Sequence, residues 1–174
     1  MEEMFVSLDT NKDGFLSLED WQLWADNIEK EVKPAAHLMK ALRAQTKEYC
    51  AAMGIVRGTK ATKNEFLKGI AAMAVTEKAK KERGEETALH KLNNAFYDIV
   101  DANHDGCVTL DEWKIILRAC NFDVSAADET FKVIDKNKNG KIERNELSDA
   151  EFNFWYTLDD AGSQGMFGDK FEKK

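Results

Sequence analysis

Three twelve-residue segments place oxygen-bearing side chains at alternate positions ahead of a glycine. They begin at Asp9, Asp101 and Asp135, and each reads Asp-x-Asn-x-Asp/Asn-Gly with an acidic residue at its twelfth position. Alternation turns the side-chain oxygens of positions 1, 3 and 5 toward one point, and the glycine at position 6 lets the chain turn sharply. Ca²⁺ is a hard cation that takes about six to eight oxygen ligands at about 2.3–2.6 Å. The spacing therefore predicts three Ca²⁺ sites.

We name these segments loop one (9–20), loop three (101–112) and loop four (135–146). The predicted ligands stand at positions 1, 3, 5, 7, 9 and 12, where position 7 gives its backbone carbonyl and position 9 binds directly or through water. They are Asp9, Asn11, Asp13, Phe15, Ser17 and Asp20 in loop one; Asp101, Asn103, Asp105, Cys107, Thr109 and Glu112 in loop three; and Asp135, Asn137, Asn139, Lys141, Glu143 and Glu146 in loop four. Each loop aims three carboxylates at the ion, so Ca²⁺ is expected to contribute folding energy.

A fourth loop is expected between loops one and three, because helix-loop-helix units of this kind pair. The register Gly54–Glu65 fits, and we name it loop two. Val56 and Gly58 replace the ligands at positions 3 and 5. Thr62 and Glu65 remain at positions 9 and 12, where they predict only a helix cap. Loop two is therefore expected to be a structural partner for loop one that binds no ion.

The elements around the loops are predicted to be helices, since the chain has one proline and few alternating β-type segments. Apolar residues at position 8 of the three intact loops predict a short two-stranded ladder between paired loops. The expected helices cover 1–8, 18–31, 35–52, 64–83, 85–100, 110–120, a segment beginning at Ser125, and 144–158. This gives an all-α fold with one pair of units in residues 1–83, a second pair in 84–158, and a tail in 159–174 that carries Met166, Phe167 and Phe171.

Composition excludes several classes of protein. The formal net charge of −7 disfavours nucleic acid and anionic membrane as partners. No apolar run reaches the length of about 20 residues that a membrane span needs. Three cysteines without C-x-x-C spacing indicate reduced thiols, and no secretory signal is recognised, so a cytoplasmic location is expected. No hydrolase, phosphate-binding or zinc motif is present, and the chain is not expected to be an enzyme.

The loops have the pattern of the EF-hand family, and their order resembles the invertebrate sarcoplasmic calcium-binding proteins. The resemblance rests on intact loops one, three and four, a degenerate loop two, Asp20 at position 12 of loop one, and the aromatic tail. Coelenterazine-binding proteins and calcium-triggered photoproteins share this layout. The resemblance implies four EF-hand units in two pairs, packed on each other as a compact globule. It also implies a Ca²⁺ buffer.

Four functions compete on this sequence. A buffer is favoured over a sensor, because no methionine lies in the helices around loops three and four, where a sensor would present an adaptable groove to a protein target. A small apolar ligand such as a coelenterazine-type luciferin is a further alternative, but the aromatic side chains are expected to fill the interior. A photoprotein requires histidines around its luciferin and a C-terminal proline, whereas this chain has only His37, His90 and His104 and ends in Phe-Glu-Lys-Lys.

Loop one is expected to discriminate least against Mg²⁺. Its twelfth residue, Asp20, is one methylene shorter than Glu112 or Glu146. A shorter arm favours closure through one oxygen, which suits the six ligands at about 2.0–2.1 Å that Mg²⁺ prefers.

Overall fold

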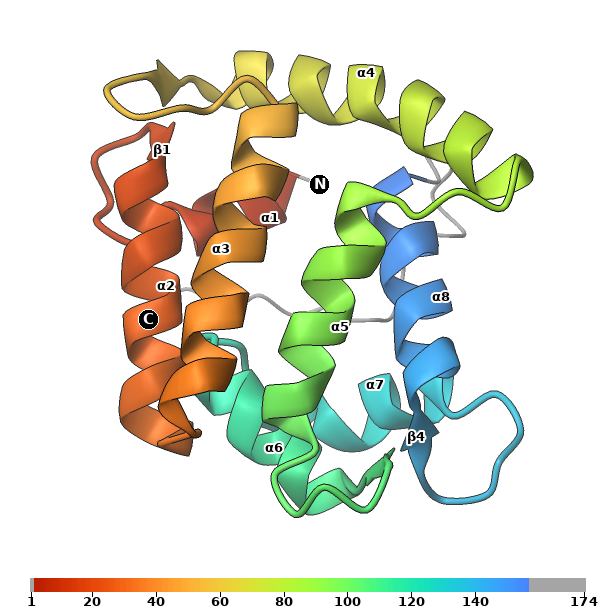
Figure 1. The fold of residues 1–174 in the computed structure, drawn as a ribbon. Helices are drawn as coiled ribbons and strands as arrows, with labels where there is room; N and C mark the ends of the chain where they lie inside the picture. The colour runs from red at the N-terminus through yellow and green to blue at the C-terminus, as the bar shows by residue number, and fades with distance from the viewer. Residues whose placement is uncertain (1, 157–174) are drawn as a thin grey trace.

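The computed structural model describes residues 2–156 and is mostly helical (Figure 1). Its α-helices are α1 (Glu2–Leu8), α2 (Leu18–Val32), α3 (Ala36–Ala52), α4 (Lys63–Glu82), α5 (Ala88–Val100), α6 (Leu110–Ala119), α7 (Ala127–Ile134) and α8 (Arg144–Tyr156), with a 3₁₀ turn η1 (Val124–Ala126) before α7. Four two-residue strands lie in the loops: β1 (Leu16–Ser17), β2 (Lys60–Ala61), β3 (Cys107–Val108) and β4 (Ile142–Glu143). The expected all-α fold of four EF-hand units is confirmed.

The strands pair the loops as the sequence predicts. Leu16 lies opposite Ala61, and Val108 lies opposite Ile142, so position 8 of one loop meets position 8 of its partner in both ladders. This places loop two beside loop one in the predicted register.

Hydrogen bonds from nearby side chains cap the N-termini of several helices and fix where they begin. The Thr62 hydroxyl accepts from the Glu65 amide at 3.4 Å, and the Glu65 carboxylate accepts from the Thr62 amide at 2.8 Å, which confirms the predicted cap of α4. Two starts differ from the predicted ones. α5 begins at Ala88 rather than at residue 85, because the Thr87 hydroxyl caps it by accepting from the amide of His90. The helix expected from Ser125 begins with η1, and its first full α-turn starts at Ala127.

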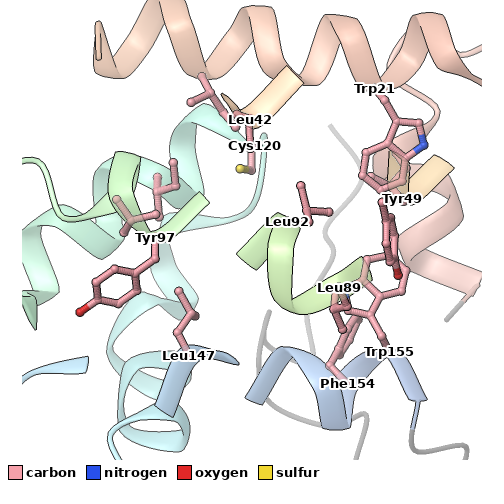
Figure 2. Close-up of a cluster of buried hydrophobic side chains, with 14 of the residues drawn as sticks. Trp21, Leu42, Tyr49, Leu89, Leu92, Tyr97, Cys120, Leu147, Phe154 and Trp155 are labelled. Atoms are coloured by element: carbon pink, nitrogen blue, oxygen red, sulfur yellow. The ribbon is translucent and has the colours of Figure 1, made fainter. Parts of the chain in front are cut away.

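The two EF-hand pairs pack face to face, with α3 along α5 and α2 along α6 (Figure 1). Aromatic rings join them: Tyr49 meets Trp155 edge to face with centroids 5.9 Å apart, and Trp24 stacks on Phe96 at 5.7 Å. Buried side chains of both pairs form one continuous core, part of which Figure 2 shows. The compact globule is therefore confirmed, while a domain boundary at residue 84 stays a prediction. The tail 159–174 and its expected packing lie outside the described residues.

Candidate metal centre and adjoining cavity

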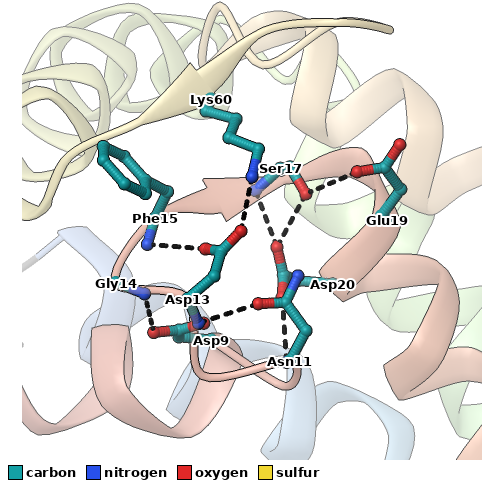
Figure 3. Close-up of polar contacts among 9 residues, drawn as sticks. All are labelled: Asp9, Asn11, Asp13, Gly14, Phe15, Ser17, Glu19, Asp20 and Lys60. Atoms are coloured by element: carbon teal, nitrogen blue, oxygen red, sulfur yellow. Dashed lines mark hydrogen bonds and ion pairs between the residues drawn. The ribbon is translucent and has the colours of Figure 1, made fainter.

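Loop one is folded around the carboxylate of its first residue (Figure 3). The two oxygens of Asp9 accept from the backbone amides of Asp13 at 3.1 Å and Gly14 at 2.9 Å. Asn11 Oδ1 accepts from the Asp13 amide at 2.9 Å, and Asp13 Oδ1 accepts from the Phe15 amide at 3.0 Å. Gly14 has φ +83°, which permits the turn at position 6. The side-chain oxygens of positions 1, 3 and 5 thus gather on the inside of one turn.

Loops three and four repeat this geometry. Asp101 accepts from the amides of Asp105 at 3.1 Å and Gly106 at 3.0 Å. Asp135 accepts in the same way from the amides at positions 5 and 6 of loop four, at 3.1 and 2.9 Å. At position 7, Cys107 and Lys141 each donate their amide to the position-5 side chain, as Phe15 does. The three predicted sites are therefore built alike, from residues close together in the chain.

The acidic residue at position 12 ties the start of the exiting helix to its loop. Asp20 accepts from the amides of Asn11 at 3.2 Å and Ser17 at 2.9 Å. Glu146 makes the two equivalent bonds in loop four, to the amides of Asn137 at 3.2 Å and Glu143 at 2.9 Å. The shorter side chain of Asp20, fully buried at 0% exposure, thus reaches the same two backbone groups as a glutamate. The preference of loop one for Mg²⁺ stays a prediction.

Hydroxyl groups at position 9 lie next to position 12. Ser17 Oγ donates to Asp20 at 2.7 Å, and Thr109 Oγ1 donates to Glu112 at 2.8 Å. Among residues 2–156, no three carboxylate, thiol or imidazole groups converge closely enough to hold an ion by themselves. Amide, hydroxyl and backbone oxygens must therefore complete each shell. An oxygen-only donor set of this kind fits Ca²⁺ or Mg²⁺ rather than a softer metal.

A lysine of loop two reaches into loop one, which the sequence reasoning missed (Figure 3). Lys60 Nζ lies 2.5 Å from Asp13 Oδ2, the ligand expected at position 5. This hydrogen bond lowers the pKa of the Asp13 carboxyl. The antiparallel ladder, which sets Lys60 opposite Ser17, brings the ammonium group there. The signal was available in the predicted register, since Lys60 stands at position 7 of loop two.

A cavity of about 60 Å³ lies between the two EF-hand pairs, against the helices that flank the loops. Its wall includes Leu8, Trp21, Trp24, Phe96 and Trp155, so most of it is apolar and both EF-hand pairs contribute aromatic rings. Leu8 directly precedes the first ligand position of loop one, and Trp21 directly follows the twelfth. The expectation that aromatic side chains fill the interior therefore holds for most of the core but fails at this point.

Three residues of the cavity wall carry polar groups without a partner among residues 2–156. The indole Nε1 of Trp21 and the amide Nδ2 of Asn93 are buried and make no hydrogen bond. Glu151 is 7% exposed and forms no hydrogen bond or ion pair, and burial raises its pKa to about 8. Sequence reasoning did not find Asn93 or Glu151, because nothing in the local pattern of α8 shows that the Glu151 carboxylate turns inward. None of the three histidines is among the described residues of the cavity wall.

Comparison with known proteins identifies the family. Residues 90–150 match the model of the EF-hand domain pair, and residues 1–23 match an EF-hand model. A luciferin-binding protein of Renilla reniformis is 30% identical over 173 residues, which covers 97% of this chain and 91% of that protein. The chain belongs to the EF-hand calcium-binding family. Calcium is thereby established as the kind of ion that the family binds.

Two further EF-hand relatives match this chain over most of its length. Obelin of Obelia geniculata is 30% identical over 168 residues, covering 95% of this chain and 86% of obelin. The Mg²⁺-loaded apo form of berovin, a light-sensitive ctenophore photoprotein whose three Ca²⁺-binding loops all bind magnesium, is 25% identical with a TM-score of 0.81. That match covers 88% of this chain and 85% of berovin.

The hypothesis of a Ca²⁺ buffer is wrong, because the relatives are a luciferin-binding protein and photoproteins. The resemblance to sarcoplasmic proteins rested on loop order, which these EF-hand groups share. The residues of the loops indicate ion binding, but they do not indicate whether the core binds a ligand. Here the core contains a cavity with polar groups that have no partner among residues 2–156. As for membranes, no helix in the described range is long and apolar enough to cross one.

Proposed function

We propose that this protein is a Ca²⁺-regulated carrier of an aromatic luciferin of the coelenterazine type, which it binds without oxidising. The observation that carries the proposal is the cavity between the two EF-hand pairs. Its apolar and aromatic wall bears the Trp21 and Asn93 groups that have no partner among residues 2–156, together with the buried Glu151. Aromatic walls with a few polar groups are typical of sites for small organic ligands. The 30% identity to a luciferin-binding protein over nearly the whole chain supports this ligand class.

Ca²⁺ in this proposal occupies loops one, three and four, held by the eighteen residues predicted as ligands above. Binding draws the carboxylates at positions 1, 5 and 12 together and offsets their mutual repulsion. Loop two holds no ion in this scheme and supports loop one through the β1–β2 ladder.

Loop one is the site proposed to exchange Mg²⁺ most readily. The substitution Asp20→Glu should therefore reduce the competition that millimolar Mg²⁺ exerts in a Ca²⁺ titration. If Mg²⁺ competes equally in the wild type and in Asp20→Glu, the length of the side chain at position 12 does not set the ion selectivity of loop one.

Regulation follows from the short path between loop one and the cavity. Leu8 and Trp21 line the cavity and are the immediate chain neighbours of Asp9 and Asp20. Any change in the closure of loop one therefore moves two walls of the cavity. Helices α5 and α8, which flank loops three and four, contribute further wall residues, and Cys120 directly after α6 contributes another. Ca²⁺ binding at any of the three loops thus acts on the same cavity.

The size of the cavity indicates the direction of regulation. Pockets for drug-sized ligands hold roughly 300–1,000 Å³, whereas this cavity measures about 60 Å³. The described conformation is therefore contracted, and a luciferin must separate the helices to enter. Loops held closed by Ca²⁺ favour the contracted form, so Ca²⁺ lowers the affinity for the ligand and releases it.

A carrier is favoured over a photoprotein by the composition of the cavity. The described wall residues include no imidazole, which is the side chain most used for proton transfer in catalysis. The carrier therefore delivers luciferin for oxidation elsewhere.

The proposal is tested by titrating coelenterazine into the protein in EGTA and in Ca²⁺, following tryptophan fluorescence and emitted light. We expect one ligand per chain in EGTA, at least tenfold weaker binding in Ca²⁺, and no flash when Ca²⁺ is added. Leu92→Phe, which adds bulk to the cavity wall, should weaken binding, whereas Leu23→Phe on the exposed face of α2 should not. Absence of binding in both conditions would refute the carrier, and a flash without luciferase would establish a photoprotein.

A further inference from the structure

The side chain of Glu151 is an exception among the buried carboxylates of the core. Glu77 is similarly buried, at 2% exposure, but its oxygens accept from Lys80 Nζ at 3.0 Å and from the amide of Leu89 at 3.2 Å. Glu151, at 7% exposure, has neither an ion pair nor a hydrogen bond among residues 2–156. A buried carboxyl without a partner costs free energy of folding. An apolar residue at this place in α8 would avoid that cost.

The groups around Glu151 leave it uncharged at neutral pH. Tyr49 of α3 and Cys120 at the end of α6 are the titratable groups that interact with it, and burial raises the pKa of both, that of Cys120 to about 12. Glu77 of α4 is held by its own partners, and the wall residues from α1, α2 and α5 do not titrate. No described cation offsets a charge on Glu151. The carboxyl therefore keeps its proton and is a hydrogen-bond donor.

We propose that Glu151 orients the luciferin and selects it by donating a hydrogen bond to an acceptor oxygen or nitrogen of its aromatic heterocycle. The inference rests on the proposed carrier function and specifies the chemistry of the same cavity. Asn93 Nδ2 and Trp21 Nε1 are also donors without partners, so the polar groups of this wall offer hydrogens. A site of this kind favours a neutral ligand with acceptor atoms over one that presents only donors.

The test compares the wild type with Glu151→Gln and Glu151→Leu. Glutamine keeps an N–H donor of similar shape, whereas leucine removes it. Coelenterazine affinity is measured in EGTA between pH 6.5 and 9.5, with Glu129→Gln on the exposed surface of α7 as the matched control. Thermal unfolding and Ca²⁺ titration show whether each variant is folded.

We expect Glu151→Gln to bind within about threefold of the wild type at pH 7, and Glu151→Leu to bind at least tenfold more weakly, the effect of one lost hydrogen bond to a buried ligand. The leucine variant should nevertheless unfold at a higher temperature. Wild-type affinity should fall at least tenfold as pH rises through about 8, where Glu151 loses its proton. The glutamine variant should lack this fall, and any ionisation of the ligand itself is common to both proteins.

Two outcomes overturn the inference while the carrier function stands: equal affinity of wild type and Glu151→Leu, or identical pH profiles of wild type and Glu151→Gln. Stronger wild-type binding above pH 8 would also overturn it, since the ionised carboxylate would then be the binding form. Failure of the wild type to bind coelenterazine at any pH refutes the proposed function instead. If Glu151→Leu does not fold, the pH profiles of the other two proteins still decide.

Discussion

At the scale of single residues, the contact between Lys60 and Asp13 places a cation of the protein at a proposed Ca²⁺ ligand. Occupation of loop one must displace this ammonium group from the carboxylate at position 5. The strand register that positions Lys60 is the feature that pairs the two loops, so a side chain of loop two reaches a predicted ligand of loop one.

Removal of this lysine charge should strengthen Ca²⁺ binding to loop one. We expect Lys60→Gln to raise the affinity of that site about two- to fivefold, since a surface ion pair is weak. Lys68→Gln removes the same charge from the exposed surface of α4 and should have less effect. Calorimetric titration of both variants measures the difference. Equal affinities for the two variants would show that net charge, rather than the Asp13 contact, governs the site.

Glu151 should make the stability of the protein depend on pH. In the unfolded chain this carboxyl loses its proton above about pH 4.5, whereas burial in the fold raises its pKa to about 8. The folded state therefore binds more protons between these values, and the free energy of unfolding falls as pH rises across the window. At 1.36 kcal/mol for each pH unit, this penalty approaches about 5 kcal/mol.

Glu151→Gln removes that titration. The variant should match the wild type near pH 4.5 and exceed its free energy of unfolding by a margin that grows until about pH 8. Denaturant unfolding at a series of pH values measures this margin. A constant difference across the series would show that Glu151 is solvated in the folded protein.

At the scale of elements, one buried hydrogen bond connects α6 to α7. Trp113 Nε1 donates to Thr130 Oγ1 at 2.8 Å, and both residues are buried. These helices leave loop three and enter loop four, so the bond fixes how the two loops of the second EF-hand pair approach each other. Among residues 2–156, the indole has no second acceptor to replace the hydroxyl if it is lost.

Thr130→Val keeps the volume of the side chain and deletes its hydroxyl. The Trp113 N–H is then buried without an acceptor, and we expect the free energy of unfolding to fall by about 1–3 kcal/mol. Thr130→Ser keeps the hydroxyl and loses one methyl group, so its loss should be about 1 kcal/mol. Chemical denaturation of the three proteins gives the comparison. A valine variant as stable as the wild type would mean that water replaces the hydroxyl.

At the scale of the whole molecule, charge and ion binding are coupled. The formal net charge is −7, and three Ca²⁺ ions would leave a net charge of −1. Ion binding should remove the repulsion between the carboxylates of each loop. Because both EF-hand pairs share one core, this should stabilise the entire globule. The cavity lies in that shared core, and the proposed regulation requires that ion binding to either pair changes it.

Saturation should therefore require three ions per chain. Glu112→Gln removes one carboxylate of loop three and should reduce the count to two, with a lower unfolding temperature in Ca²⁺. Isothermal titration calorimetry and thermal unfolding provide these numbers. A count of four would mean that loop two binds an ion in spite of Val56 and Gly58.

The sequence by itself determined the loops, their pairing and the fold. Ligand spacing, the glycine at position 6 and the acidic residue at position 12 act within twelve residues, and the apolar residue at position 8 sets the ladder. Such short-range patterns survive in the linear sequence because their geometry is local. The buffer hypothesis failed because it extended a local pattern to a property of the interior.

The tertiary structure alone decided what the interior holds. Lys60 meets Asp13 across 47 positions of the chain, and the cavity is enclosed by helices from both EF-hand pairs. The amino-acid sequence does not distinguish a glutamate on an exposed helix face from the buried Glu151. Their difference arises only when α8 packs against α3 and α5, which removes water from Glu151 while residues 2–156 supply no hydrogen-bond partner in its place.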